Sequence, residues 1–248
     1  MKLRRFRVHK QNIHGQEAII EDRDEIRHLS KVLRLRIGDP VILFDGEGKE
    51  YPASISGLLP EKISLTLSRD PSPPTVESSL RILLGAGLLK SSKFEWLLQK
   101  TTEVGVSEVI PFYSLHVVPR WSETQTETRR ARWEKIVSEA AKQCGRARLP
   151  KIHSPRPFEE ALAADFAGAT KIFLWEREKT KNLEDALEKP VSAVFALVGP
   201  EGGFSEREAL QAQEAGFHPV RLGPRVLRAE TAGVVIVSLL QFILGDLS

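Results

Sequence analysis

The chain has 248 residues, of which 41% are hydrophobic, so it is long enough for one large domain or two smaller ones, each with its own core. Its single cysteine excludes an internal disulfide framework and fits a reducing cytoplasm, where we expect the protein to work. The net charge of +3 is modest. The amino terminus lacks the apolar core of a signal peptide, and the longest apolar stretch, Val234 to Leu244, is too short to span a bilayer.

Residues 1 to 70 are expected to form a small β-barrel, because short apolar runs alternate there with turn signals. The predicted strands are Val41–Phe44, Tyr51–Ile55 and Ile63–Leu67. A helix is predicted over about Asp22–Leu33, with its apolar face formed by Ile26, Leu29, Val32 and Leu33.

Two basic clusters lie in this amino-terminal segment. The first is Arg4, Arg5 and Arg7, and the second, along one face of the predicted helix, is Arg27, Lys31 and Arg34. A solvated surface would explain either cluster alone. Two clusters on one small barrel also fit contacts with an RNA backbone, and both interpretations stay open.

The stretch Ser68 to Pro74 marks a domain boundary, because its closely spaced prolines cannot continue a helix or a central strand. We therefore divide the chain into a barrel (residues 1–70), a proline-rich linker (residues 71–74) and a second domain (residues 75–248).

The second domain alternates strands and helices, which predicts a mostly parallel sheet. The predicted strands are Leu80–Leu84, Val109–Tyr113, Lys171–Trp175, Ala193–Val198 and Pro219–Leu222. The predicted helices are Lys93–Val104, Arg129–Cys144, Phe158–Phe166, one that begins at Ser205, and Thr231–Leu244. Gly85-Ala86-Gly87 could open a dinucleotide-binding turn, but Lys90 stands where the third glycine belongs.

The helix over Arg129–Cys144 has a basic end. Trp133, Ile136, Val137, Ala140 and Cys144 recur at helical spacing and are expected to lie in the core. Cys144 is therefore expected to be a core residue rather than a nucleophile. Arg146 and Arg148 follow the helix stop Gly145, in a loop where we expect contact with RNA.

Two loops near the carboxyl terminus are the candidate site. Gly199-Pro200-Glu201-Gly202-Gly203 follows one predicted strand, and residues 222–232 follow another. Glycine-rich loops at the carboxyl ends of neighbouring parallel strands form a crevice for a small ligand. Ordinary turns would also use Gly and Pro. However, Arg225, Arg228 and Glu230 stand beside a strongly apolar helix, and charges there need a partner or a function.

These loops, Val198–Gly203 and Leu222–Ala232, resemble the paired signatures of the RsmE family, with further matches at Gln99–Val106 and at Lys142–Arg146 with Arg148. The resemblance runs nearly end to end. It implies an α/β fold of the SPOUT class, with a trefoil-knotted, mostly parallel sheet and an amino-terminal PUA-like RNA-binding β-barrel. It also implies a homodimer that uses S-adenosylmethionine to methylate N3 of a uridine in 16S ribosomal RNA of the small subunit, uridine 1498 in the family.

The resemblance also implies the site residues, without a metal. S-adenosylmethionine is expected between the two loops, at Leu197, Gly199, Pro200, Gly202, Leu222, Gly223, Leu227, Thr231 and Ala232. Arg225 and Arg228 are candidates to stabilise the uridinate anion from which N3 attacks. Glu230 is a candidate to handle the proton or to orient an arginine, and a structural ion pair is the alternative.

Three other functions remain to be weighed. A SPOUT enzyme with another nucleotide target would carry the same loops. A ribosome-associated RNA-binding protein without activity would not need them, and a nicotinamide oxidoreductase would bind that cofactor instead. Measuring cofactor binding separates the last two from the methyltransferases.

Overall fold

The structure is a computed structural model of the chain, and it describes residues 3–68, 76–115, 121–164, 166, 168–187 and 190–247. Its contacts divide the chain into a first unit, Met1–Glu77 with Ser138–Leu149, and a second unit, Ser78–Val137 with Pro150–Ser248. Residues 138–149, which the sequence assigns to the second domain, are thus grouped with the first unit. The linker expected at residues 71–74 lies outside the described residues.

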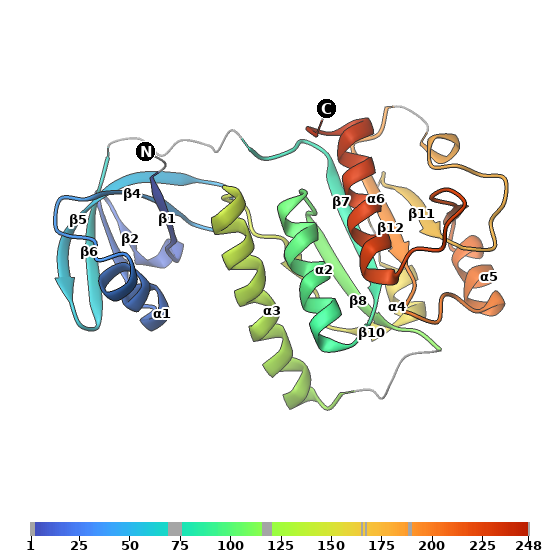
Figure 1. The fold of residues 1–248 in the computed structure, drawn as a ribbon, viewed down its shortest axis with the longest axis horizontal. Helices are drawn as coiled ribbons and strands as arrows, with labels where there is room; N and C mark the ends of the chain where they lie inside the picture. The colour runs from blue at the N-terminus through green and yellow to red at the C-terminus, as the bar shows by residue number, and fades with distance from the viewer. Residues whose placement is uncertain are drawn as a thin grey trace. The chain divides into compact units, whose positions relative to one another are not determined.

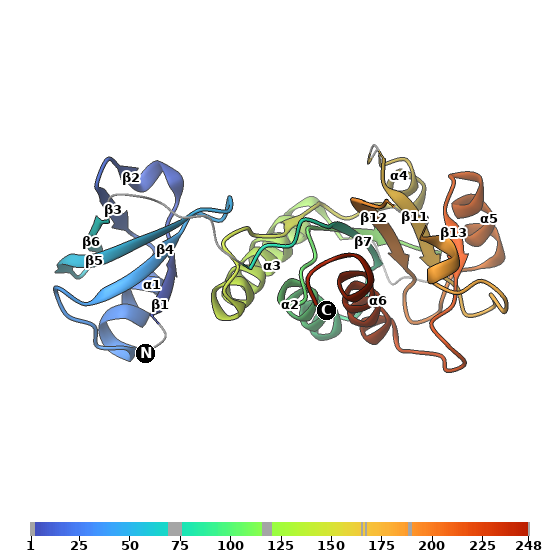
Figure 2. The same cartoon turned by 90° about the horizontal axis from the view of Figure 1, so that it is seen from above.

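A curled six-stranded sheet forms a half-barrel in the first unit (Figures 1 and 2). The strand order is β1-β4-β5-β6-β3-β2, and every neighbouring pair is antiparallel except β1 with β4. The strands are β1 (Arg4–Arg7), β2 (Ile13–His14), β3 (Glu17–Ile20), β4 (Pro40–Phe44), β5 (Glu50–Leu59) and β6 (Lys62–Leu67). Inward side chains such as Phe6, Leu43 and Ile63 are fully buried in one core. The predicted barrel and its three strands are confirmed.

The helix expected over residues 22–33 changes type partway. α1 (Arg23–Arg27) begins after Asp22, whose carboxylate accepts hydrogen bonds from two N–H groups of the first turn. The next turn, η2 (His28–Val32), is a π-helix. Because a π-turn holds more residues than an α-turn, the predicted apolar face is interrupted. Leu29 is fully buried as expected, but Val32 is 65% exposed, so its assignment to that face is wrong.

The second unit contains a parallel sheet, which confirms the prediction from the alternating elements. Its strand order is β10-β8-β7-β12-β11-β13, β9 pairs with β8, and every pairing is parallel. The strands are β7 (Arg81–Gly87), β8 (Glu108–Tyr113), β9 (Lys151–Ile152), β10 (Arg156–Pro157), β11 (Thr170–Leu174), β12 (Ala193–Val198) and β13 (His218–Val220).

Helices cover both faces of this sheet (Figure 2). They are α2 (Ser91–Glu103), α3 (Glu123–Cys144), α4 (Phe158–Leu162), α5 (Glu206–Glu214) and α6 (Ala229–Leu244). Short 3-10 turns occur at η1 (Lys10–Asn12) in the first unit and at η3 (Glu184–Ala186) in the second. Adjacent residues of β7 point to opposite faces. Leu83 packs in the core with α4 and α5, whereas Leu84 lies beside Gly233 of α6, which packs against α2. No helix in the described part of the chain is long and apolar enough to cross a membrane.

Three predicted boundaries in the second unit are wrong. β7 continues through Gly85 to Gly87, because Gly85 is paired with Leu197 of β12 and Ile110 of β8 on its two sides. α3 begins at Glu123, earlier than expected, since its first turns are polar and lack an apolar period. α4 ends at Leu162 rather than at Phe166. Two side chains of α3 that were expected in the core, Ile136 and Cys144, are only half-buried.

Candidate active-site cleft

Three strand ends meet at one edge of the parallel sheet. β12 leads into Gly199–Gly203, β13 leads into residues 221–228, and β11 leads into Trp175–Glu178. Since the strands are parallel, their carboxyl ends lie at the edge where α/β sheets bind ligands. The expectation that the two glycine loops follow neighbouring strands is wrong, because β11 lies between β12 and β13.

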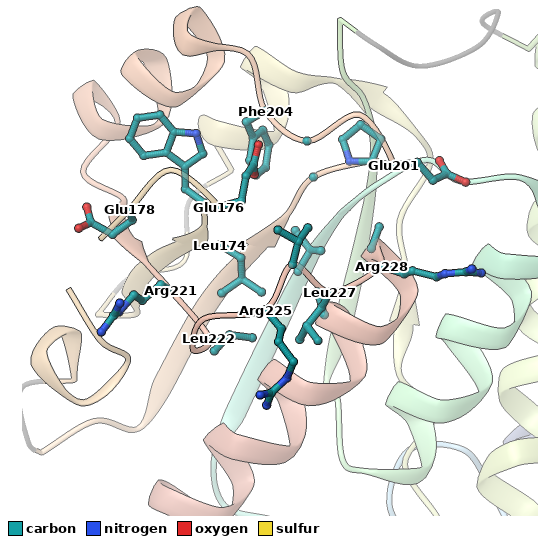
Figure 3. Close-up of a pocket in the computed structure, with 18 of the residues that line it drawn as sticks. Leu174, Glu176, Glu178, Glu201, Phe204, Arg221, Leu222, Arg225, Leu227 and Arg228 are labelled. Carbon is teal, nitrogen blue, oxygen red and sulfur yellow. The ribbon is translucent and has the colours of Figure 1, made fainter. Parts of the chain in front are cut away.

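The three loops enclose a cleft of about 330 Å³ (Figure 3). Small-molecule sites in proteins occupy roughly 300–1,000 Å³. The sequence-predicted residues that line the cleft are Gly199, Pro200, Gly202, Leu222, Gly223, Arg225, Leu227, Arg228 and Ala232. Three others are not among the lining residues: Leu197 is fully buried in β12, and Glu230 and Thr231 lie half-buried in the first turn of α6. The structure therefore brings most of the predicted set together.

Two glycines allow the first loop to lie against its neighbours. A Cβ atom on Gly87, the last residue of β7, would lie 2.6 Å from the backbone nitrogen of Pro200. Gly203 has a φ of +69°, and a Cβ there would lie 2.8 Å from a carboxylate oxygen of Glu176. A side chain at Gly87 would force the backbone apart, whereas one at Gly203 would strain the left-handed backbone and displace the Glu176 carboxylate. The loop is thus packed between the ends of β7 and β11.

Charged side chains of both signs line the cleft (Figure 3). Glu176 and Glu178 lie on the β11 side, while Arg225 and Arg228 come from the second loop and point in different directions. Arg228 extends to the same side as Glu201. Sequence reasoning missed Glu176 and Glu178, because nothing in the local pattern places β11 between the two loops. No group of three or more His, Cys, Asp and Glu side chains among the described residues could hold a metal ion.

Glu178 is ionised at neutral pH. Its carboxylate accepts hydrogen bonds from the backbone N–H groups of Thr180 and Lys181 and from the Thr180 hydroxyl. These bonds stabilise the charged form and lower the pKa of Glu178 to about 2. Glu178 therefore contributes a negative charge to the β11 side of the cleft at neutral pH.

A lysine from α2, which sequence reasoning also missed, joins the two loops. The Lys93 ammonium lies 3.1 Å from Glu201 Oε1 in the first loop and 3.8 Å from Glu230 Oε1 at the start of α6. Lys93 also lines the cleft. The other oxygen of Glu230, Oε2, is buried and accepts no hydrogen bond from the described residues. In the sequence nothing distinguishes Lys93 from Lys90 or Lys100.

The helix that follows the first loop is fixed at its amino end, as predicted. The Ser205 hydroxyl accepts from the Glu208 N–H, and the Glu208 carboxylate accepts from the Ser205 N–H, which is a capping box. The Glu208 carboxylate also accepts a 2.8 Å hydrogen bond from the N–H of Leu115. Burial of the Glu208 carboxyl favours its neutral form, but the N–H groups of Leu115 and Ser205 outweigh burial and hold its pKa below the ordinary value of 4.5.

The residues predicted to contact RNA fall into two groups in the first unit. The exposed ones are Arg4, Arg27, Lys31, Arg34 and Arg148. The others are buried or half-buried, and two of them have internal partners. Arg5 pairs with Glu50 and donates a hydrogen bond to the carbonyl of Arg146, while Arg146 is 6% exposed and pairs with Glu77. Arg7 is half-buried. The sequence could not distinguish the exposed arginines from the paired ones, because the acidic partners of Arg5 and Arg146 are distant in sequence.

Known proteins match this chain over most of its length. A model described as an RNA methyltransferase domain matches residues 76–241, and one described as an RNA methyltransferase PUA domain matches residues 20–68. Two curated relatives are named ribosomal RNA small subunit methyltransferase E. That of Buchnera aphidicola (subspecies Acyrthosiphon pisum) is 31% identical over 224 residues, which are 89% of this chain and 87% of the relative. That of Bacillus subtilis is 28% identical over 242 residues, which are 94% and 93% of the two chains.

A solved structure matches the whole fold. It is a crystal structure of a ribosomal RNA small subunit methyltransferase E from Neisseria gonorrhoeae, bound to S-adenosyl methionine. It is 32% identical, with a TM-score of 0.90 and 100% of each chain covered. The parallel sheet and curled barrel are therefore a SPOUT-type domain and a PUA-like domain. The chain belongs to the ribosomal RNA small subunit methyltransferase E family.

Proposed function

We propose that this chain transfers a methyl group from S-adenosylmethionine to N3 of a uridine in 16S ribosomal RNA, uridine 1498 in the family. The observation that carries the proposal is the cleft between the two loops, Gly199–Gly203 and residues 221–228. The sequences of these loops match the family, and the similar structure from Neisseria gonorrhoeae contains S-adenosyl methionine.

The residues of the cleft fit S-adenosylmethionine, which carries a flat aromatic adenine ring and a positive charge on sulfur. Leu174, Leu222 and Leu227 offer apolar walls, and the carboxylates of Glu176 and Glu178 offer negative charge. We propose that the cofactor is held by Leu197, Gly199, Pro200, Gly202, Leu222, Gly223, Leu227, Thr231 and Ala232. Glycine in this set leaves backbone N–H and C=O groups open to the ligand.

The reaction requires positioning and charge stabilisation from the chain. When bound, S-adenosylmethionine supplies a methyl group activated by its sulfonium. The loops align N3 with that methyl group, which lowers the entropic part of the barrier. Since neutral uridine carries a proton on N3, the attacking species is the uridinate, and we assign its stabilisation to Arg228 and Arg225. We assign Glu230 to proton handling or to orienting the cation beside it.

We propose that the first unit binds the RNA. We assign phosphate contacts to the exposed residues Arg4, Arg27, Lys31, Arg34 and Arg148. We assign a supporting role, beneath the surface that presents these residues, to Arg5, Arg7 and Arg146, which are buried or half-buried. The division into a barrel of residues 1–70, a linker of residues 71–74 and a methyltransferase domain of residues 75–248 is part of this proposal, with residues 138–149 packed on the barrel.

We also propose a cytoplasmic homodimer. The outer face of α6 is apolar, and its Phe242 is 61% exposed. A second copy covering this face would remove that apolar surface from water. Light scattering at micromolar protein should then give twice the mass of one chain, and a monomer would contradict the dimer.

The enzymatic test measures transfer of labelled methyl groups from S-adenosylmethionine to small-subunit ribosomal RNA that lacks the modification. We expect incorporation that depends on the protein, together with calorimetric binding of the cofactor. Cofactor binding with methyl transfer to another nucleotide would favour a SPOUT enzyme with a different target. Absence of both cofactor binding and transfer would favour a non-catalytic RNA-binding protein.

A further inference from the structure

Three charged side chains from three separate segments meet beside the cleft. Lys93 stands in the first turn of α2, Glu201 in the loop after β12, and Glu230 in the first turn of α6. The ammonium of Lys93 lies between the two carboxylates, at 3.1 Å and 3.8 Å. The Lys93 ammonium thus links both signature loops to α2, a helix that follows neither loop.

We propose that Lys93 is a positioning residue for methyl transfer, which orients the Glu230 carboxylate and fixes the first loop against α2 and α6. This inference rests on the proposed function and adds a residue that no signature loop contains. Lys93 acts through Glu230 on the reacting groups, so its main effect is on the rate.

The two links of Lys93 differ in strength because they differ in exposure. The Glu201 side chain is 40% exposed, so solvent screens its pairing with Lys93. The Glu230 side chain is 12% exposed, and its Oε2 is buried without a hydrogen bond from the described residues. A partly desolvated carboxylate depends more on the cation that remains near it. Loss of Lys93 should therefore disturb Glu230 more than Glu201.

The backbone supports the same arrangement. Gly87 ends β7 shortly before α2 and has no side chain. The backbone nitrogen of Pro200 in the first loop lies 2.6 Å from the position that a Cβ atom of residue 87 would take. The first loop therefore already lies near the start of α2. Arg228, which immediately precedes α6, extends to the same side of the cleft as Glu201 (Figure 3). Lys93 thus stands where the first loop, the second loop and a candidate catalytic arginine converge.

The first experiment compares Lys93→Met with Arg81→Met in single-turnover methylation at saturating RNA and cofactor. Arg81 is the control, because it also pairs with a half-buried carboxylate, that of Glu108 at 3.3 Å, but stands at the amino end of β7, away from the cleft and outside the signature segments of the family. We expect Lys93→Met to lower the rate at least about tenfold, the order expected for a lost charged contact to a partly buried group. Arg81→Met should stay within about fivefold of wild type, as for an exposed pair. Equal rates for the two variants would overturn the proposal.

The second experiment separates positioning from packing. Lys93→Arg keeps the charge and reach and should restore most of the rate, while cofactor affinity measured by calorimetry should change less than about fivefold in both Lys93 variants. Lys93→Met should add little to Glu230→Gln, since Lys93 acts through that carboxylate. Effects that multiply in the double variant, or a rate for Lys93→Arg as low as for Lys93→Met, would refute this role.

Two features keep the test decisive. Methyl groups are counted on whole ribosomal RNA, whichever nucleotide receives them, so an error in the proposed target does not alter the comparison. Should Lys93→Met fail to fold, Lys93→Gln replaces it in the same comparisons, with its melting temperature measured beside that of Arg81→Met. A Lys93→Gln protein that folds and keeps the wild-type rate would contradict the proposal.

Discussion

Substitution of Gly87 by alanine should disturb the first loop of the cleft. The new Cβ would lie 2.6 Å from the Pro200 nitrogen, 2.7 Å from its Cδ and 3.0 Å from the Gly199 carbonyl carbon. Two of these atoms belong to the backbone and the third to a ring, so none can rotate away as a flexible side chain would. Either the loop or the end of β7 has to move. Overpacking of this kind costs about 1–3 kcal/mol, which is roughly 5- to 150-fold in an equilibrium constant.

The cost should appear in one of two measurements. If β7 keeps its position, the first loop is displaced and cofactor affinity falls, as calorimetry would measure. If the loop keeps its position, the end of β7 is strained and the free energy of unfolding falls, as urea denaturation would measure. Gly57→Ala is the matched control, because Gly57 is also a strand residue and its Cβ would meet Ser64 at 3.5 Å, an ordinary contact. A Gly87→Ala protein with both quantities unchanged would refute the reasoning.

Three further predictions test the charges. Arg225→Ala or Arg228→Ala should lower the single-turnover rate by about a hundredfold to a thousandfold, the effect of losing one preorganised donor to a developing anion, with partial recovery as pH rises. Near-wild-type rates for both would exclude the electrostatic role. Since the folded-state pKa of Glu208 is depressed, its contribution to stability is present above the unfolded value of about 4.5 and is lost as pH falls through the lower folded value. Glu208→Gln should therefore be less stable at neutral pH and lose less stability on acidification, as thermal denaturation across pH would show. Loss of one exposed phosphate contact should weaken RNA binding and reduce the slope of log K against log salt by about one. We expect this in filter-binding titrations, with cofactor affinity unchanged, for alanine variants of Arg27, Lys31 and Arg34.

Local patterns predicted much of the second unit. The apolar run Ala193–Val198 is strand β12 in full, because a strand buried on both faces reads as a continuous apolar segment. Ser205 and Glu208 form the predicted capping box, a signal contained in two residues at fixed spacing. Phe94, Leu97, Leu98 and Thr101 of α2 are all buried, as their helical period predicts.

The errors concern order in space and features of the backbone that apolar periodicity does not encode. No periodicity reveals that β11 lies between β12 and β13, so Glu176 and Glu178 of the cleft were missed. The π-turn His28–Val32 follows from hydrogen bonds that apolar spacing does not encode. Lys93 became a candidate only when folding brought Glu201 and Glu230 beside it. The trefoil knot came from the resemblance, and it stays a prediction.

Mapping the modified nucleotide tests the central claim most directly. Small-subunit ribosomal RNA treated with the protein and S-adenosylmethionine is digested, and the methylated fragment is identified by mass spectrometry. Reverse transcription is run in parallel, because a methyl group on N3 occupies the pairing edge of uridine and stops the polymerase. The account predicts one methylated uridine with a stop beside it, and no product with Arg228→Ala on the same timescale. A methyl group on another base, or on a uridine that the polymerase reads through, would contradict it.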